Sequence, residues 1–196
     1  MWKQQLLAFT EKLQHPAWGT SHFQRIYELS IQLAKEQNID VDQDALFAAA
    51  YLHDIGAFEP YRRPEIDHAV RSIQLVEEIL TPMDFPAEKI PIVKDIIRGH
   101  MFYEIPPSNI ESIIFHDADV LDFMGIIGVT RLLSIVGISD WAPDLRSAVE
   151  LIKRFIKELP EKLHTNQARK IGEIRQKEME IYLETLSKET QNLQVL

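Results

Sequence analysis

Apolar residues recur with helical spacing along almost the whole chain, and this periodicity constrains the fold more than any other feature of the sequence. Runs of alternating Val, Ile and Thr, which are typical of half-buried strands, are missing, and only 7 of the 196 residues are glycine. The pattern therefore predicts an all-α protein. We expect helices over residues 2–13, 20–37, 45–52, 65–80, 84–100, 110–122, 125–136, 142–159 and 165–188.

The expected helices follow one another without a linker, a low-complexity tract or an internal repeat, so a single domain over residues 1–196 is the economical interpretation. A chain of this length buries roughly 70% of the surface that its unfolded form exposes, and it needs no metal or disulfide merely to fold. A bound metal would therefore serve chemistry. The segment 125–138, rich in Ile and Leu, could pack within this domain or across a homodimer, and periodicity does not separate these two arrangements.

The net charge of −9 and the absence of cysteine exclude several classes of function. Polynucleotide binding needs clustered Lys and Arg, which an acidic chain does not supply as a broad face. A chain without cysteine has no disulfide, iron–sulfur cluster or cysteine nucleophile. The most apolar stretch, 126–138, is too short for a membrane span of about 20 residues, and the first residues lack the pattern of a signal peptide. We expect a cytoplasmic protein that binds neither polynucleotide nor membrane.

Polar residues interrupt two otherwise apolar helices. His53 and Asp54 end the apolar run 45–52, at the start of a loop that contains glycine. Two adjacent buried polar groups are costly unless something satisfies them, and a metal ion would do so. Asp119 breaks into a second apolar helix, where it shares a face with Asp122. By spacing alone, these carboxylates are equally compatible with helix caps or solvated edge residues.

The order of these residues resembles the HD superfamily of metal-dependent phosphohydrolases, an all-α family in which a histidine, a His-Asp pair and a distant aspartate hold one divalent cation. The matching segments are His22-Phe23-Gln24-Arg25-Ile26, Leu52-His53-Asp54-Ile55-Gly56 and Asp117-Ala118-Asp119-Val120-Leu121-Asp122 with Gly125, Gly128 and Arg131. Small single-domain bacterial hydrolases, including nucleotide pyrophosphohydrolases, are the most similar members. A weaker match at 165–170 and Arg175 extends the resemblance over most of the chain. It implies an HD helical bundle with its core motifs at 22–131, C-terminal helices at 142–188 packed on it, and a metal site in its core.

The resemblance implies four metal ligands: His22, His53, Asp54 and Asp119. Two further histidines, His68 and His100, fall where some HD subfamilies bind a second metal, and they could hold that metal or the substrate. A shell of imidazole and carboxylate without sulfur accepts several divalent ions. The family implies Mn or Fe first, with Co, Ni, Mg and Zn as alternatives. The three remaining histidines are expected to be structural or exposed: His15, His116 and His164.

The implied reaction is hydrolysis of a nucleotide or another small phosphate ester or anhydride, with metal-activated water attacking phosphorus. Five basic residues are candidates for binding the phosphate, although each is also compatible with a solvated surface charge: Arg62, Arg63, Arg131, Lys170 and Arg175. Many HD hydrolases carry an ionisable residue four positions after the central histidine, where this chain has Ala57. Asp54 would act by binding the ion, and Glu59 or Asp122 could replace the missing ionisable group.

Departures from the family pattern leave other functions open. Ala57 favours a non-catalytic module that senses a nucleotide or a metal, and Val120 stands where close relatives often have arginine. His68 and His100 are compatible with a diiron oxygenase, since a few HD proteins with six ligands activate oxygen. The remaining alternative is a helical domain whose histidines have no function. It would require these residues to match the order of the family motif by chance. All functional interpretations require the four implied ligands to converge on one point.

Overall fold

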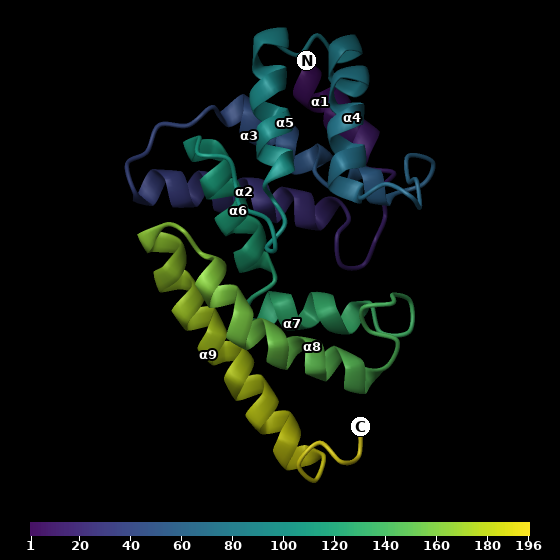
Figure 1. The fold of residues 1–196 in the computed structure, drawn as a ribbon, viewed down its shortest axis with the longest axis vertical. Helices are drawn as coiled ribbons and strands as arrows, with labels where there is room; N and C mark the ends of the chain where they lie inside the picture. Colours follow the sequence, from purple (N-terminus) through teal and green to yellow (C-terminus); the bar gives the residue numbers. More distant parts are fainter. The chain divides into compact units, whose positions relative to one another are not determined.

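The computed structural model describes all 196 residues, which form nine α-helices, four short 3₁₀-helices and no strand (Figure 1). The prediction of an all-α protein is confirmed. The α-helices are α1 (Trp2–Thr10), α2 (Thr20–Glu36), α3 (Gln43–Leu52), α4 (His68–Leu80), α5 (Ile90–Arg98), α6 (Ile110–Asp122), α7 (Gly125–Ser134), α8 (Leu145–Glu158) and α9 (Asn166–Glu189). The 3₁₀-helices are η1 (Ile55–Ala57), η2 (Thr81–Met83), η3 (Ala87–Lys89) and η4 (Leu159–Lys162).

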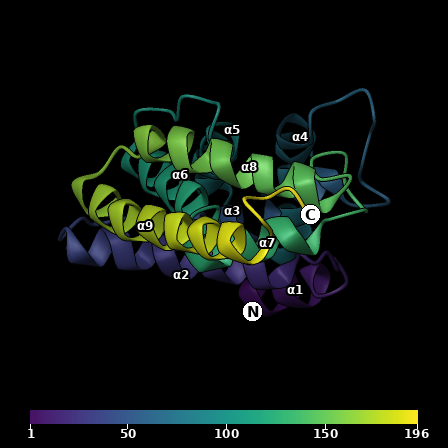
Figure 2. The ribbon, with the colours of Figure 1, turned by 90° about the horizontal axis from the view of Figure 1, so that it is seen from below.

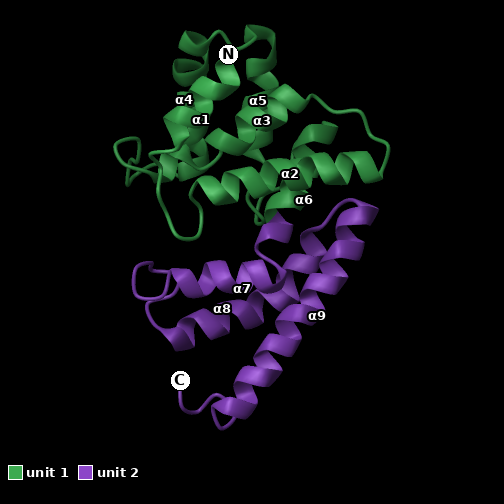
Figure 3. Ribbon diagram, turned by 180° about the vertical axis from the view of Figure 1, so that it is seen from behind, with its two compact units in different colours: residues 1–119 green, residues 120–196 purple.

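The chain divides into two compact units, unit 1 over Met1–Asp119 and unit 2 over Val120–Leu196 (Figure 3). Helix α6 continues across the boundary, so that its last turn belongs to unit 2. The expectation of a single domain stays a prediction. No helix combines the length and the apolar character that a membrane span requires.

Helix α3 forms the centre of unit 1. Every residue from Ala45 to Leu52 is buried, and α1, α2 and α5 pack against this helix. Figure 1 shows α4 and α5 upright next to each other, with α2 running crosswise. His53 and Asp54 follow α3 directly, so the chain places an imidazole and a carboxylate where it leaves the apolar core.

Aspartates fix the starts of two helices in unit 1. The side chain of Asp42 caps α3 by accepting hydrogen bonds from two backbone N–H groups of the first turn. Asp67 caps α4 in the same way, with Oδ1 accepting from the N–H of Ala69 at 2.8 Å. The expected start of α4 at residue 65 was therefore three residues too early, and His68 is the first residue of the helix.

The turn before α2 has a glycine at the N-cap position. Helix α2 begins at Thr20, but its N-cap residue is Gly19 and no side chain caps it, because the Thr20 hydroxyl donates to the Thr10 carbonyl at 3.2 Å. A Cβ atom at Gly19 would lie 2.7 Å from the carbonyl oxygen of His15, so this turn has no room for a side chain. The Nδ1 atom of His15 accepts from the N–H of Trp18 at 3.3 Å, which gives this histidine a structural role.

Unit 2 consists of α7, α8 and α9, and each of these helices packs against the other two. Figure 2 shows α9 running lengthwise beside α8. Asp144 caps α8 by accepting from the N–H of Ser147 at 2.7 Å, and Thr165 caps α9. Gly172 of α9 lies so near the Leu163 side chain that a Cβ atom there would be 2.4 Å from it, which brings the last helix close to the segment before it.

Candidate metal centre

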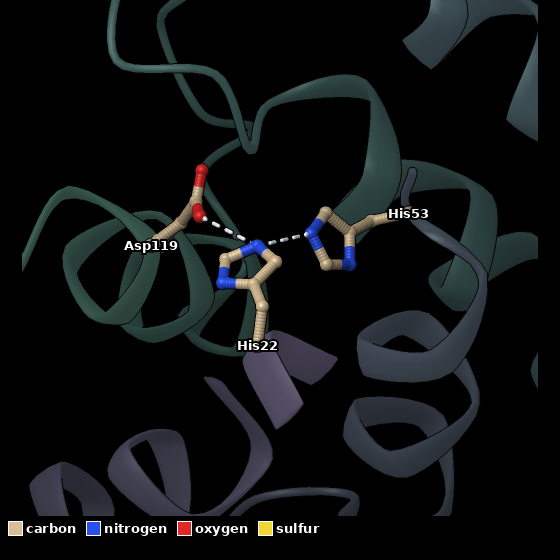
Figure 4. A group of neighbouring side chains, drawn as sticks. All are labelled: His22, His53 and Asp119. Atoms are coloured by element: carbon tan, nitrogen blue, oxygen red, sulfur yellow. Dashed lines mark hydrogen bonds and ion pairs between the residues drawn. The ribbon is translucent and has the colours of Figure 1, made fainter. Parts of the chain in front are cut away.

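Three polar side chains of unit 1 lie around the ring atom Nε2 of His22. His53 Nε2 lies 3.1 Å from this atom, Asp119 Oδ1 lies 3.5 Å away and Asp54 Oδ2 lies 3.7 Å away. Figure 4 shows His22 between His53 and Asp119, with both side chains directed toward its ring. The four residues supplied by α2, the end of α3 and α6 therefore converge on one point.

The two carboxylate oxygens of Asp54 face different histidines. Oδ2 lies 3.4 Å from His53 Nε2, on the side of His22. Oδ1 lies 3.4 Å from His68 Nε2 and 3.6 Å from His100 Nε2. In each of two overlapping groups, one potential ligand atom from each residue lies within 4.8 Å of those of the others: His22, His53 and Asp119, and His53, Asp54 and His100. Asp54 thus connects the first group to the additional histidines.

His53 and His100 are oriented by the same local contact. The Nδ1 atom of His53 bonds to the carbonyl oxygen of Ala50 at 2.9 Å, and that of His100 bonds to the carbonyl oxygen of Ile97 at 2.7 Å. A carbonyl oxygen only accepts, so each Nδ1 carries the hydrogen. In the neutral ring, Nε2 then has a lone pair, and in both histidines this atom faces Asp54.

Acceptor atoms therefore face one another in a buried place. Asp119 Oδ1 and His100 Nε2 are buried without a hydrogen-bond donor, and His22 and His53 are at most 1% exposed. Buried acceptors that face each other are unfavourable unless a proton or a cation lies between them. Imidazole nitrogens and carboxylate oxygens suit divalent ions of intermediate hardness. The buried group could hold a divalent metal ion.

The charges within this group influence one another. Burial acts most strongly and would raise the pKa of Asp54, but the electrostatic interaction with His53 and the contact with His100 hold that pKa well below its usual range. Burial would lower the pKa of His100, but the contact with Asp54 raises it overall. The pKa of His68 is lowered, chiefly by burial. Asp54 is therefore ionised at neutral pH, as a metal ligand must be.

The basic residues expected to bind phosphate lie in two kinds of environment. Arg62 and Arg63 are exposed in the loop between η1 and α4, and Lys170 is exposed on α9. In unit 2, the guanidinium of Arg131 is buried and that of Arg175 donates a hydrogen bond to the carbonyl oxygen at position 121, at 2.5 Å. The first three can reach solvent, whereas the last two already make contacts inside the protein.

The carboxylates expected to assist proton transfer also differ. Glu59 is exposed in the loop after η1, and Ala57 is the last residue of η1. Asp122 is buried and its Oδ2 atom lies 2.8 Å from Nη1 of Arg131, whose guanidinium lies 4.1 Å from the centroid of the Phe123 ring. Asp122 and Arg131 therefore form a buried ion pair at the end of α6.

Two polar residues next to the centre were not singled out as functional from the sequence. Ser72 is buried on α4, and its Oγ atom accepts a hydrogen bond from the N–H of Gly56 at 2.9 Å. His116, expected to be structural or exposed, is fully buried, and its Nδ1 atom donates to the carbonyl oxygen of Gly99 at 2.8 Å. A serine within the apolar stripe of α4 was a usable signal for Ser72, whereas spacing along the chain does not reveal the partner of His116. The remaining histidine, His164, is exposed.

Solved structures of other proteins share this fold. YpgQ from Bacillus subtilis, in a crystal structure with ADP, is 22% identical, with a TM-score of 0.71 and coverage of 95% of this chain and 97% of that one. An HD-superfamily hydrolase from Bacillus thuringiensis is 24% identical, with a TM-score of 0.66 and coverage of 95% of both chains. A protein from an uncultured Thermotogales bacterium, described as a predicted HD superfamily hydrolase, is 24% identical, with a TM-score of 0.66 and coverage of 96% and 90%.

These identities establish likeness of fold alone, and no curated protein matches the sequence. The sequence itself matches the model of the HD domain over residues 19–124, which is more than half of the chain. This match contains the four converging residues and the two additional histidines. The chain therefore belongs to the HD domain family.

Proposed function

We propose that this protein is a metal-dependent phosphohydrolase that acts on a nucleotide or another small phosphate ester or anhydride. The proposal is carried by one observation: ligand atoms of His53, Asp54 and Asp119 lie 3.1–3.7 Å from Nε2 of His22 in a buried group. A divalent ion bound there would polarise a phosphoryl oxygen and lower the pKa of a bound water. The HD-superfamily hydrolases among the proteins of the same fold support this class of reaction.

The orientation of Asp54 supports a second ion. Its Oδ2 atom faces the first group, and its Oδ1 atom lies within 3.6 Å of both His68 and His100. A carboxylate that offers one oxygen to each side is suited to connect two cations. We propose that His68 and His100 complete this second position rather than bind phosphate alone.

Residues of the exposed loop are the candidates for contact with the substrate. Arg62 and Arg63 are exposed between η1, which follows the His-Asp pair, and α4, which begins with His68. We propose that they neutralise phosphate charge. Glu59 in the same loop is the candidate for receiving the proton of the attacking water, because Ala57 has no ionisable group.

A nucleotide is the substrate class that we favour. The Bacillus subtilis protein of the same fold binds ADP in its crystal structure. Mn and Fe are the preferred ions, because the HD family implies them and the donor set contains nitrogen and oxygen without sulfur.

The test is release of phosphate and of pyrophosphate from a panel of nucleotides and simple phosphate esters. Metal-stripped protein would be supplied in turn with Mn, Fe, Co, Ni, Mg and Zn. We expect metal-dependent release that falls to background in Asp119→Asn, which keeps the shape of the side chain but weakens the ligand. The matched control is Asp84→Asn, because Asp84 is exposed in unit 1 and its left-handed backbone (φ 58) suits asparagine.

The same panel distinguishes the competing functions. A folded, metal-loaded protein that binds nucleotides without turnover would contradict hydrolysis and support a sensor, as Ala57 suggests. Oxygen consumption by the iron-loaded protein, without phosphate release, would support an oxygenase built on His68 and His100.

A further inference from the structure

Two glycines beside the metal centre have no room for a side chain. Gly56 comes two residues after the His-Asp pair, and a Cβ atom there would lie 2.3 Å from the carbonyl oxygen of His68. Gly99 comes directly before His100, and a Cβ atom there would lie 2.5 Å from Cδ of Pro107. At both positions the backbone is therefore pressed against a neighbouring segment of unit 1.

Each of these glycines also makes a hydrogen bond to a buried polar side chain. The N–H of Gly56 donates to Oγ of Ser72 at 2.9 Å, and the carbonyl of Gly99 accepts from Nδ1 of His116 at 2.8 Å. Ser72 and His116 are both fully buried. In such surroundings a hydrogen bond to the backbone restricts the position of that backbone, because losing the bond would leave a buried polar group unsatisfied.

The first contact joins the His-Asp turn to α4. Ser72 lies one helical turn after His68 on this helix, and Gly56 lies in η1, directly after Asp54 and Ile55. The contact therefore sets how far the start of α4 stands from the turn. That distance decides whether Nε2 of His68 can lie 3.4 Å from Oδ1 of Asp54.

The second contact joins α6 to the end of α5. His116 lies on α6, one turn before Asp119, and Gly99 is the C-cap residue of α5, immediately before His100. The contact fixes the backbone from which the His100 ring projects. It therefore sets the position of His100 Nε2, which lies 3.6 Å from Oδ1 of Asp54.

We infer that Ser72 and His116 are positioning residues that hold His68 and His100 beside Oδ1 of Asp54 and so build the second metal position. Both act through the backbone of a glycine next to a ligand. The inference rests on the proposed two-ion function. The first position depends less on these contacts, because His22 and Asp119 project from regular helices and His53 is held by its own bond to the Ala50 carbonyl.

The experiment measures how many Mn²⁺ ions the full chain binds. Metal-stripped protein is titrated with Mn²⁺, bound metal per chain is measured by elemental analysis, and EPR detects an exchange-coupled pair of ions. Ser72→Ala removes one hydroxyl without disfavouring the helix. Its matched control is Ser30→Ala, because Ser30 is equally buried but its hydroxyl donates only to Ile26 of its own helix, at 2.8 Å.

His116 is tested with two substitutions that separate the hydrogen bond from the packing. His116→Leu fills similar space without a donor. His116→Asn retains an N–H donor near the position of Nδ1. We expect His116→Leu to behave like Ser72→Ala and His116→Asn to recover much of the wild-type behaviour.

The expected result is two ions in the wild type, in Ser30→Ala and largely in His116→Asn. In Ser72→Ala and His116→Leu, the second ion should bind roughly 10–100-fold more weakly, with loss of the coupled EPR signal and retention of the first ion. Two ions of wild-type affinity in Ser72→Ala and His116→Leu would overturn the positioning role while leaving the proposed function intact. Loss of both ions in these variants would also overturn it, since the effect would not be selective. A single ion in the wild type would overturn the second position itself, and with it both the two-ion function and this inference.

Discussion

Each of the two units buries charged side chains, but in opposite ways. In unit 1, imidazole nitrogens and carboxylate oxygens face one another around His22 and Asp54, and Asp119 Oδ1 has no donor. In unit 2, Asp122 and Arg131 are complementary in charge and lie 2.8 Å apart. The second arrangement brings opposite charges together, whereas the first brings acceptor atoms together and requires a proton or a cation between them. Buried polar groups without a partner of complementary charge therefore indicate a ligand site better than a buried ion pair does.

The largest expected effect is on the pair in unit 2. Arg131→Ala would leave the carboxylate of Asp122 buried without this counter-charge, so the free energy of unfolding should fall by about 3–5 kcal/mol. Urea denaturation followed by circular dichroism measures this change.

The control for that prediction replaces both members of the pair. Asp122→Leu combined with Arg131→Met should restore most of the lost stability, because a buried ion pair can be exchanged for packed apolar groups. Equal destabilisation by the single and double variants would show that the ion pair is not what Arg131 contributes.

Removing a charge from the candidate metal centre in unit 1 should have the opposite effect on the free energy of unfolding. Without metal, Asp119→Asn removes a buried charge with no donor on Oδ1, so the free energy of unfolding should stay constant or rise. With Mn²⁺ at 100 times its dissociation constant, the wild type should gain about 2.7 kcal/mol. Thermal scans with and without Mn²⁺ measure this gain, and a similar shift in Asp119→Asn would place the bound ion elsewhere.

A smaller effect is expected where a side chain caps a helix and also forms an ion pair with Lys89 at 3.0 Å. Asp42→Ala removes the cap of α3, the helix that leads to the His-Asp pair, and should lower the free energy of unfolding by about 1 kcal/mol. The Mn²⁺ stoichiometry should not change. Asp42→Ser keeps a capping oxygen and is the control, so a loss of metal in Asp42→Ala alone would mean that the cap also shapes the centre.

The smallest effect belongs to a partly exposed carboxylate, Asp44, that forms ion pairs with two lysines. Asp44 lies 2.8 Å from Lys3 and 3.0 Å from Lys89, and its pKa is lowered, chiefly by the hydrogen bond with Lys3. Because the folded pKa lies below the ordinary pKa of 3.8, the stabilisation is present above pH 3.8 and is lost as the pH falls through the folded pKa. Asp44→Asn should cost about 0.5 kcal/mol at neutral pH. Urea titrations of both proteins should converge as the pH falls below 3.8, and a constant difference would assign the effect to something other than charge.

The sequence predicts the existence of the helices better than their starts. Helix α6 begins and ends where the periodicity indicated, over Ile110–Asp122. Helix α5 was expected from residue 84, but Asp84 adopts a left-handed conformation (φ 58) and the helix begins only at Ile90. Helix α2 begins at Thr20 as expected, but periodicity gave no sign that Gly19 before it is required by close contact with the His15 backbone. Helix starts that depend on such contacts cannot be predicted from the local spacing of apolar residues.

The same distinction applies to the centre. The four converging residues were identified because their order along the chain matches a family motif. That match indicates that they lie close together but gives no physical reason for it. Ser72 and Gly56 are 16 residues apart, and His116 and Gly99 are 17 apart, so neither contact follows a helical repeat. Likewise, the pairing of Asp122 with Arg131 depends on the turn between α6 and α7. These partners become visible only when the helices are packed.

The two carboxylate oxygens of Asp54 face different groups of histidines, and this has a thermodynamic consequence for metal binding. Two ions that share one aspartate cannot bind independently, because the charge that each draws from the carboxylate is withdrawn from the other, while each also orders the side chain for the other. Whatever factor the first ion imposes on the affinity of the second, the second imposes on the first. The proposed two-ion site would then fill with rising concentration of free metal along a curve whose steepness depends on this coupling through Asp54.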